Sequence, residues 1–313
     1  MLDEQTEGQA TYYDYTESRK AKWKTLPKFQ TIESETELGS TAIVVRGQIY
    51  LVGVAGCDFR GFARYNAETN RWDTLASALA VHWQICMVEL HGYIYAISGE
   101  RNGRYDEDLL VERYSIETDQ WENVSPLKPG GYITDTTAVV FKEMILIAGC
   151  DFDQEADEEG DENNKLTMQI YNPASDTWHI VYREKLRPRC DPLLKVHKSE
   201  CYLILQGGNG VNHTTVHQLT CDIEGDLPTV CLGEEIPQNP SISKFYGAFT
   251  IDNDVFVNIH RCVYECTNKV TDGGVDLGLL ADMISTYYPV VCFTFDKRRY
   301  CPTGLSKAME KPK

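Results

Sequence analysis

The sequence contains three tyrosine–tryptophan pairs in which the tyrosine lies seven residues before the tryptophan. The pairs are Tyr65/Trp72, Tyr114/Trp121 and Tyr171/Trp178, and the tryptophans lie 49 and 57 residues apart. A fourth tryptophan, Trp23, lies 49 residues before Trp72. Self-similarity at about 50 residues is typical of β-propellers, in which each repeat is one small sheet that buries its faces only against its neighbours. The spacing therefore predicts an all-β ring.

Composition and charge narrow the class of protein. The chain has 313 residues, of which 42% are hydrophobic and 25% charged, as in a soluble globular domain. No apolar stretch approaches the roughly 20 residues of a membrane helix, and the acidic, polar residues 1–9 do not form a signal peptide. A net charge of −17 argues against nucleic acid and anionic membranes as partners. It suits a basic protein segment, or it serves solubility alone.

Eleven cysteines show no short-range disulfide framework. Several of them, such as Cys86, Cys201 and Cys292, sit inside apolar segments, where a free thiol behaves as a small hydrophobe. We therefore expect a reducing compartment, the cytoplasm or also the nucleus, and no structural disulfides.

Each repeat is expected to form four antiparallel strands. In one repeat an apolar run at 84–90 leads through a two-residue turn, His91 and Gly92, into a strand at 93–98. A third strand at 111–114 and a short fourth strand opened by Trp121 complete the sheet. The internal blades predicted in this way are residues 39–76, 81–125, 132–182, 189–232 and 245–280.

The two ends of the chain are expected to complete each other. Residues 11–15 and 23–26 have the pattern of a third and a fourth strand, whereas 288–295 and 299–301 have that of a first and a second. Joining 11–26 with 287–304 gives one shared blade and removes free sheet edges. The prediction is a six-bladed propeller over 11–304, with a flexible segment at 1–10 and a tail at 305–313.

These features resemble Kelch repeats. The resemblance rests on the tyrosine–tryptophan pairs, the turn glycines Gly47 and Gly92, and second strands followed by glycine, and it covers residues 11 to 304. Only one blade keeps the doubled glycine, and the last two internal blades lack the tryptophan. The phrases VERYSIETDQWENVSPL and QIYNPASDTWHIV are most similar to Kelch-like proteins that carry BTB and BACK domains before the propeller.

That resemblance implies a non-enzymatic substrate receptor of a cullin-based ubiquitin ligase. In such proteins the BTB and BACK domains bind the cullin, the BTB domain forms a homodimer, and the propeller, itself monomeric, binds the degron of the protein to be ubiquitinated. The 313 residues include no BTB or BACK segment, so the cullin link is implied by resemblance only. The alternative is a cytoskeletal, actin-associated or scaffolding Kelch protein.

In Kelch-like receptors, substrates bind the face formed by the loops that join second to third strands and each fourth strand to the next blade. Loops on a rigid scaffold are where function concentrates, and tryptophan, tyrosine and arginine dominate binding hot spots. The alternative role for the aromatic residues is packing between blades. The equivalent first-strand positions hold Gln84, Asp135 and Asp191, so a purely acidic degron is not favoured. The candidate partner-binding residues are Arg60, His82, Trp83, Arg101, Arg104, Tyr132, Arg189, Asn209, Phe245, Tyr246, Tyr287 and Tyr288.

One of these expected loops, residues 151–162, carries eight acidic residues. Such a run is usually solvated, and the alternative is that it recruits a basic segment of the partner by electrostatic steering. The acidic residues are Asp151, Asp153, Glu155, Asp157, Glu158, Glu159, Asp161 and Glu162.

The sequence predicts no metal and no cofactor. His213 and His217 flank an expected strand, and Cys262 and Cys266 form a lone pair, whereas a structural zinc site needs four ligands. Seven scattered histidines do not suit a copper-oxidase propeller, and no phosphate-binding glycine loop is present.

Overall fold

The structure is a computed structural model of the 313-residue chain. It describes residues 11–13, 23–27, 41–52, 60–66, 68–80, 85–97, 110–128, 132–153, 163–185, 190–197, 199–207, 214–222, 228–236, 247–251, 254–259, 262–271 and 274–282.

Strands account for nearly all of the described chain, because alternating apolar residues suit a pleated backbone with one or two buried faces. The strand Cys86–Leu90, for example, buries every second side chain. The strands are β1 (Thr11–Tyr13), β2 (Trp23–Thr25), β3 (Thr41–Val45), β4 (Gln48–Val52), β5 (Phe62–Asn66), β6 (Arg71–Thr74), β7 (Cys86–Leu90), β8 (Tyr93–Ile97), β9 (Val111–Ser115), β10 (Gln120–Val124), β11 (Tyr132–Phe141), β12 (Met144–Asp153), β13 (Asn163–Asn172), β14 (Thr177–Lys185), β15 (Cys190–His197), β16 (Glu200–Gly207), β17 (Thr214–Asp222), β18 (Thr229–Ile236), β19 (Gly247–Ile251), β20 (Asp254–Ile259), β21 (Cys262–Thr271) and β22 (Gly274–Asp282).

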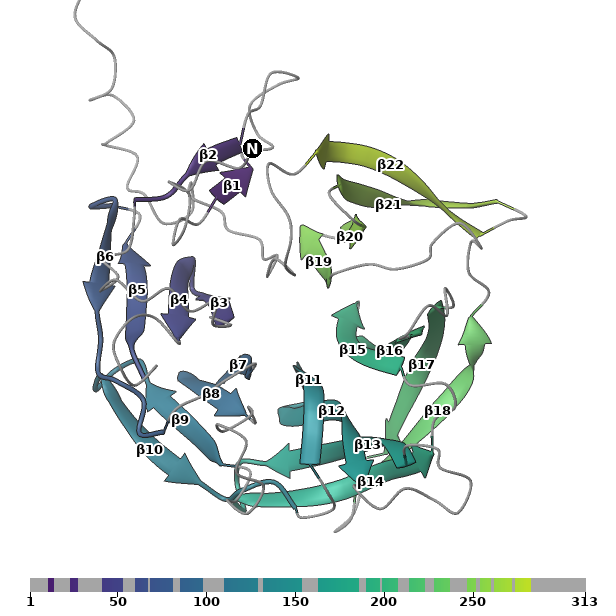
Figure 1. Ribbon diagram of the computed structural model, residues 1–313, viewed down its shortest axis with the longest axis horizontal. Helices are drawn as coiled ribbons and strands as arrows, with labels where there is room; N and C mark the ends of the chain where they lie inside the picture. The colour runs from purple at the N-terminus through teal and green to yellow at the C-terminus, as the bar shows by residue number, and fades with distance from the viewer. Residues whose placement is uncertain are drawn as a thin grey trace, which may run out of the picture.

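The strands form five four-stranded antiparallel sheets and one two-stranded sheet, each in sequence order. The sheets follow one another around a ring, with β3, β7, β11, β15 and β19 nearest its centre (Figure 1). The prediction of an all-β propeller with four-stranded antiparallel blades is confirmed. Within the described residues the sixth sheet consists of β1 and β2 alone. The strands expected at 288–295 and 299–301 lie outside the described residues, so six complete blades are not seen.

Two-residue turns join the first and second strands of the sheets. His91 and Gly92 have φ angles of 55° and 83°, and Lys142 and Glu143 have 49° and 61°. Positive φ at both central residues is the type I′ geometry, whose twist matches that of the flanking strands. The predicted turn at His91 and Gly92 is confirmed, while the third blade makes the same turn without glycine.

Several fourth strands are longer than expected. β14 continues to Lys185, β18 to Ile236 and β22 to Asp282, so three internal blades end beyond the predicted 182, 232 and 280. All three pairings contain a register shift, for example between Met168 and Gln169 of β13. An extra residue in one strand breaks the alternating pattern from which a strand end is read.

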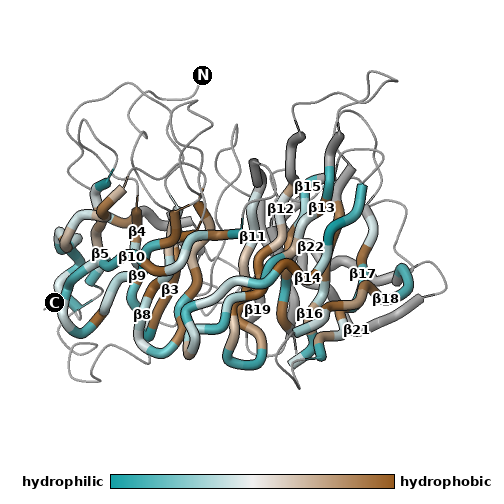
Figure 2. The backbone as a smooth tube through the Cα atoms, turned by 90° about the horizontal axis from the view of Figure 1, so that it is seen from below, coloured by the Kyte–Doolittle hydropathy of each residue, from teal (hydrophilic) through white to brown (hydrophobic). Residues whose placement is uncertain are grey.

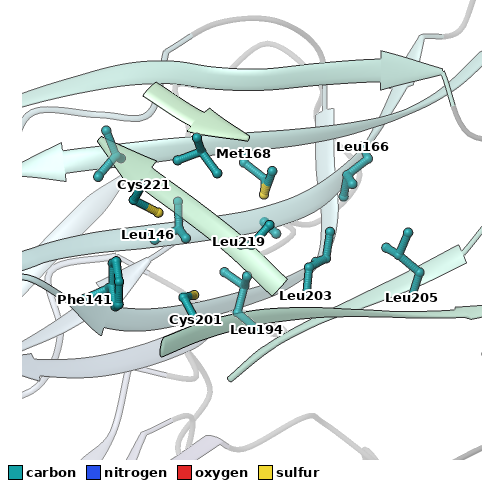
Figure 3. Packing of buried hydrophobic residues seen from close by; sticks show 13 residues of the cluster. Phe141, Leu146, Leu166, Met168, Leu194, Cys201, Leu203, Leu205, Leu219 and Cys221 are labelled. Carbon is teal, nitrogen blue, oxygen red and sulfur yellow. The ribbon is translucent and has the colours of Figure 1, made fainter. Parts of the chain in front are cut away.

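The cores lie between neighbouring sheets. One cluster joins Leu146 and Met168 of the β11–β14 sheet to Leu203 and Leu219 of the β15–β18 sheet (Figure 3). Between the β3–β6 and β7–β10 sheets, the ring of Phe62 lies edge-on 5.0 Å from Trp121. Figure 2 shows hydrophobic residues concentrated within the strands and hydrophilic residues at many of the turns. The sheets are therefore held together face to face by apolar packing.

Candidate functional site: the loop face of the ring

Strand order divides the connections into two sets. In each antiparallel sheet, the turns from first to second and from third to fourth strand leave on one side. The connections from second to third strand, and from each fourth strand to the next sheet, leave on the other side, here called the loop face. Side chains of the following sheet bind the start of three of these inter-sheet connections, two of which are described first.

The tryptophan of one sheet binds the end of the sheet before it. Trp121 donates its indole N–H to the carbonyl of Ala76 at 2.8 Å, and the amide of Ala76 donates to the Asp119 carboxylate at 2.9 Å. Asp119 also accepts a hydrogen bond from the hydroxyl of Tyr114 at 2.8 Å. Both backbone groups of Ala76 are thus satisfied by the next sheet, an arrangement here called the Trp–Asp clamp.

The same clamp recurs one sheet further on. Trp178 donates to the carbonyl of Ser125 at 2.8 Å, and the Ser125 amide donates to Asp176 at 2.9 Å. Burial alone raises the pKa of Asp176, but hydrogen bonds from Ser125 and from the Tyr171 hydroxyl outweigh it, so the pKa lies below its usual value. Burial and the bond to Asp176 raise the pKa of Tyr171. The clamp therefore favours the ionised carboxylate.

A second clamp holds the next residues of each connection. The fully buried carboxylate of Glu112 accepts hydrogen bonds from the amides of Leu79, at 2.7 Å, and Ala80, at 2.6 Å. In the following sheet, Gln169 accepts from the amide of Lys128 at 2.9 Å and donates to its carbonyl at 3.1 Å. Glu112 and Gln169 both lie two residues before the tyrosine of their repeat. They fix the backbone of 79–80 and 128 on the loop face.

The structure brings one candidate residue, Arg60, to this anchored segment. Its carbonyl accepts a hydrogen bond from the amide of Ala78 at 2.9 Å, and the amide of Leu75 donates to Phe62 at 3.0 Å. Leu79 is 48% exposed although its backbone is held from below. Residues 60–62 and 75–80 are thus joined by hydrogen bonds into one partly apolar part of the loop face, and in the sequence His82 and Trp83 follow two and three residues after Ala80.

Three other candidate residues lie on described backbone. Tyr132 begins β11, in register with Phe152 of β12. Asp151 and Asp153 were expected in a loop, and this was wrong, because β12 continues through Asp153 and pairs with β13 from Asn163. The β12–β13 hairpin is longer than predicted. Its end contains polar residues, and these lack the apolar alternation by which a strand is recognised in a sequence.

The other candidates lie outside the described residues and remain predictions. They are His82, Trp83, Arg101, Arg104, Arg189, Asn209, Phe245, Tyr246, Tyr287 and Tyr288, with Glu155, Asp157, Glu158, Glu159, Asp161 and Glu162 of the acidic run.

The sequence interpretation missed the clamp residues Glu112, Gln169, Asp119 and Asp176. A signal was present, since Asp119 and Asp176 both lie two residues before a repeat tryptophan. That position alone does not identify a clamp, because the partners of both aspartates are backbone groups more than 40 residues away.

A hollow of about 360 Å³ lies on the opposite side of the ring. It is lined by the turns at His91, at Glu143 and at 172–174, and by Tyr93 and Arg113. His91 and Glu143 approach to 2.6 Å across it, and the Arg113 guanidinium lies 4.3 Å above the Tyr93 ring while its Nε donates to Glu122. Its charged groups therefore already have partners within the chain.

The described residues contain no cluster of three or more metal-ligating side chains. His217 uses both ring nitrogens within the chain, on Gly233 and Thr215. Cys262 and Cys266 are four residues apart on β21, roughly 13 Å along a strand, which is too far for one metal ion. Cys86 and Cys201 are free thiols whose pKa burial raises to about 12. In the described part of the chain, no helix is long and apolar enough to cross a membrane.

Several curated relatives match part of the chain. Kelch repeat and BTB domain-containing protein 2 of Homo sapiens is 31% identical over 117 residues, which are 37% of this chain and 16% of the relative. F-box protein AFR of Arabidopsis thaliana is 27% identical over 132 residues, 41% of this chain and 35% of the relative. Kelch-like protein 23 of Pongo abelii is 26% identical over 152 residues, 45% of this chain and 24% of the relative. The matches thus span about a third or less of each relative's length.

No protein-family model matches the chain. Among solved structures, one described as the structure of YjhT superimposes with a TM-score of 0.56 at 11% identity, covering 83% of this chain and 88% of the other. That similarity concerns the fold alone. Two of the relatives named above carry Kelch in their names, and both match at low identity.

Proposed function

We propose that the chain is a Kelch-type propeller that closes as a six-bladed ring. The names of its relatives and the tyrosine–tryptophan repeat support the family. β1 pairs with β2, as the third and the fourth strand of one blade do, so this blade still needs a first and a second strand. In the proposed closure, 287–304 supplies those two strands.

The proposed function is that of a non-catalytic protein-interaction module whose partner binds the loop face. The observation that carries the proposal is the pair of clamps, which fix segments 75–80 and 125–128 from the sheet that follows. A binding loop held in place loses little conformational entropy when a partner docks. Arg60, the exposed Leu79 and Trp83, which follows Leu79 by four residues in the sequence, supply residue types that suit a peptide.

The more specific proposal is a substrate receptor of a cullin-RING ubiquitin ligase acting in the cytoplasm or nucleus. BTB domains appear in the name of one relative and Kelch-like in that of another. In this proposal, BTB and BACK domains outside the 313 residues bind the cullin, the BTB domain forms a homodimer, and the propeller binds the degron. If the full-length gene product fails to co-purify with any cullin, this assignment is wrong, while the interaction module stands. Co-sedimentation with actin filaments would instead favour the cytoskeletal alternative.

The loop-face proposal is tested by two matched substitutions. Leu79 and Ile180 are the large hydrophobic residues that are exposed in the described chain, at 48% and 40%. Leu79 lies on the loop face, whereas Ile180 lies on the outer strand β14. We expect Leu79→Lys, like Trp83→Ala, to lower the recovery of specific partners in quantitative pull-downs, and Ile180→Lys to leave it unchanged. Equal effects of Leu79→Lys and Ile180→Lys, or none, would place binding elsewhere.

We further propose that the acidic run recruits a basic segment of the partner. Opposite charges accelerate encounter, and salt screens that effect. Deletion of 154–162 is expected to slow association and to flatten its dependence on ionic strength, with dissociation little changed. Association kinetics that are identical with and without the segment would assign it to solubility.

A further inference from the structure

The joint between the β1–β2 sheet and the β3–β6 sheet, here called the N-terminal joint, differs chemically from the two joints that follow it. Pro27, Ala76 and Ser125 occupy equivalent positions, each four residues after a repeat tryptophan. At all three, the tryptophan of the next sheet donates to the backbone carbonyl, and at Pro27 the donor is Trp72 at 2.9 Å. This half of the Trp–Asp clamp is common to the three joints.

The other half cannot form at the N-terminal joint. Proline has no amide N–H, so Pro27 cannot donate the hydrogen bond that Ala76 and Ser125 donate. The acceptor has changed with it, because Asn70 stands where the other two repeats have an aspartate. Asn70 keeps the local role of that residue, since its side-chain oxygen accepts from Tyr65 at 2.7 Å. The N-terminal joint therefore lacks both the amide donor and the carboxylate acceptor of the charge-assisted hydrogen bond between sheets.

The polar side chain that forms the second clamp is also absent at the N-terminal joint. Glu112 and Gln169 lie two residues before their repeat tyrosines, and the equivalent residue before Tyr65 is Ala63. Ala63 is fully buried and has no polar side chain, so it can bind no backbone group of the preceding connection. Each of the next two joints gains two hydrogen bonds from this position.

We infer that, of the three joints bound by a repeat tryptophan, the N-terminal joint is the one that opens first, so that the β1–β2 sheet separates from the β3–β6 sheet while the next two joints stay closed. Each of the next two joints has four clamp hydrogen bonds. At the N-terminal joint, Pro27 and Ala63 exclude three of these four. Local opening follows the least stabilised contact, so this joint opens at a lower cost than the next two. The inference concerns the ring itself and does not depend on the proposed partner.

Native-state hydrogen exchange on the whole chain measures this opening directly. We expect amides in Thr11–Tyr13 and Trp23–Thr25 to exchange through a local opening, at least about tenfold faster than those in Val111–Ser115. Equal protection of these strands would overturn the inference.

Substitutions that exchange the clamp residues between two joints distinguish a weak joint from fraying of the chain end. Pro27→Ala with Asn70→Asp copies the second joint, and it should raise protection of β1 and β2 by about tenfold, as expected for one charge-assisted hydrogen bond. Asn70→Asp alone is the matched control, and it should change nothing because Pro27 has no proton to donate. The reverse pair, Ala76→Pro with Asp119→Asn, should lower protection of β9 and β10. If the first pair left β1 and β2 unchanged in a folded protein, fraying would be the cause and the inference would fail.

Discussion

Trp121 donates its indole N–H to the carbonyl of Ala76, 45 residues earlier and in the preceding sheet, at 2.8 Å. The repeat tryptophan therefore serves the joint between sheets as much as the core of its own sheet. Trp72 and Trp178 make the same bond, which explains why this residue marks the repeat.

Replacing Trp121 by phenylalanine tests the bond apart from the packing. The change keeps an aromatic ring near Phe62 but removes the only donor of the indole. We expect a loss of about 1 kcal/mol in the free energy of unfolding, measured by urea denaturation. Trp178→Phe should behave alike, and no loss in either variant would show that the bond contributes nothing.

Glu112 and Gln169 occupy equivalent positions but are not interchangeable. Glu112 accepts two amide protons, whereas Gln169 accepts one and donates one. Glu112→Gln therefore turns an NH₂ group toward an amide N–H, and Gln169→Glu turns a carboxylate toward a carbonyl. Each swap should cost about 1–3 kcal/mol of stability. A neutral swap at either position would mean that the backbone rearranges and that the clamp is not rigid.

Asp176 makes the free energy of unfolding of the ring depend on pH. Its folded-state pKa lies below its usual value, so the unfolded chain binds more protons. The stabilisation is thus present above the unfolded pKa of about 3.9 and is lost as pH falls through the folded pKa. Comparing urea midpoints across this range, Asp176→Asn should show a weaker fall in stability below about pH 4 than the wild type. Parallel curves would contradict the assignment.

A glycine substitution in the turn at Lys142 and Glu143 is expected to increase the stability of the protein. Glu143 has a φ angle of 61°, a region that costs a residue with a Cβ about 1 kcal/mol. Glu143→Gly should raise the melting temperature, because the exposed pair with His91 contributes little. Gly92→Ala, at a φ of 83°, should lower it by a similar amount. A loss on Glu143→Gly would instead show that the hydrogen bond between Glu143 and His91 stabilises the turn.

The sequence predicted the scaffold well, because propeller blades repeat local features that alternate every two residues. The tyrosine–tryptophan spacing located the blades, and the pairing of Tyr114 with Trp121 across the third and fourth strands follows from it. The ends of strands with register shifts were missed, since an extra residue interrupts that alternation. The hairpin through Asp153 was missed for another reason, because charged residues carry no strand signal.

The clamps could not be predicted from one repeat alone. Asp119 and Glu112 have backbone groups of another sheet as partners, so sequence pattern shows the side chain and not its target. Comparison between repeats gives the missing information, since Pro27 and Asn70 change together where the amide is absent.

The central claim is that a partner docks on the loop face held by these clamps. Hydrogen exchange of the chain with and without a partner captured in the pull-down tests it most directly. We expect protection to increase at residues 60–62 and 75–80 and in the segment that contains Trp83, while Thr177–Lys185 of β14 is unchanged. Protection confined to β14, or to the turns around His91 and Glu143, would contradict it.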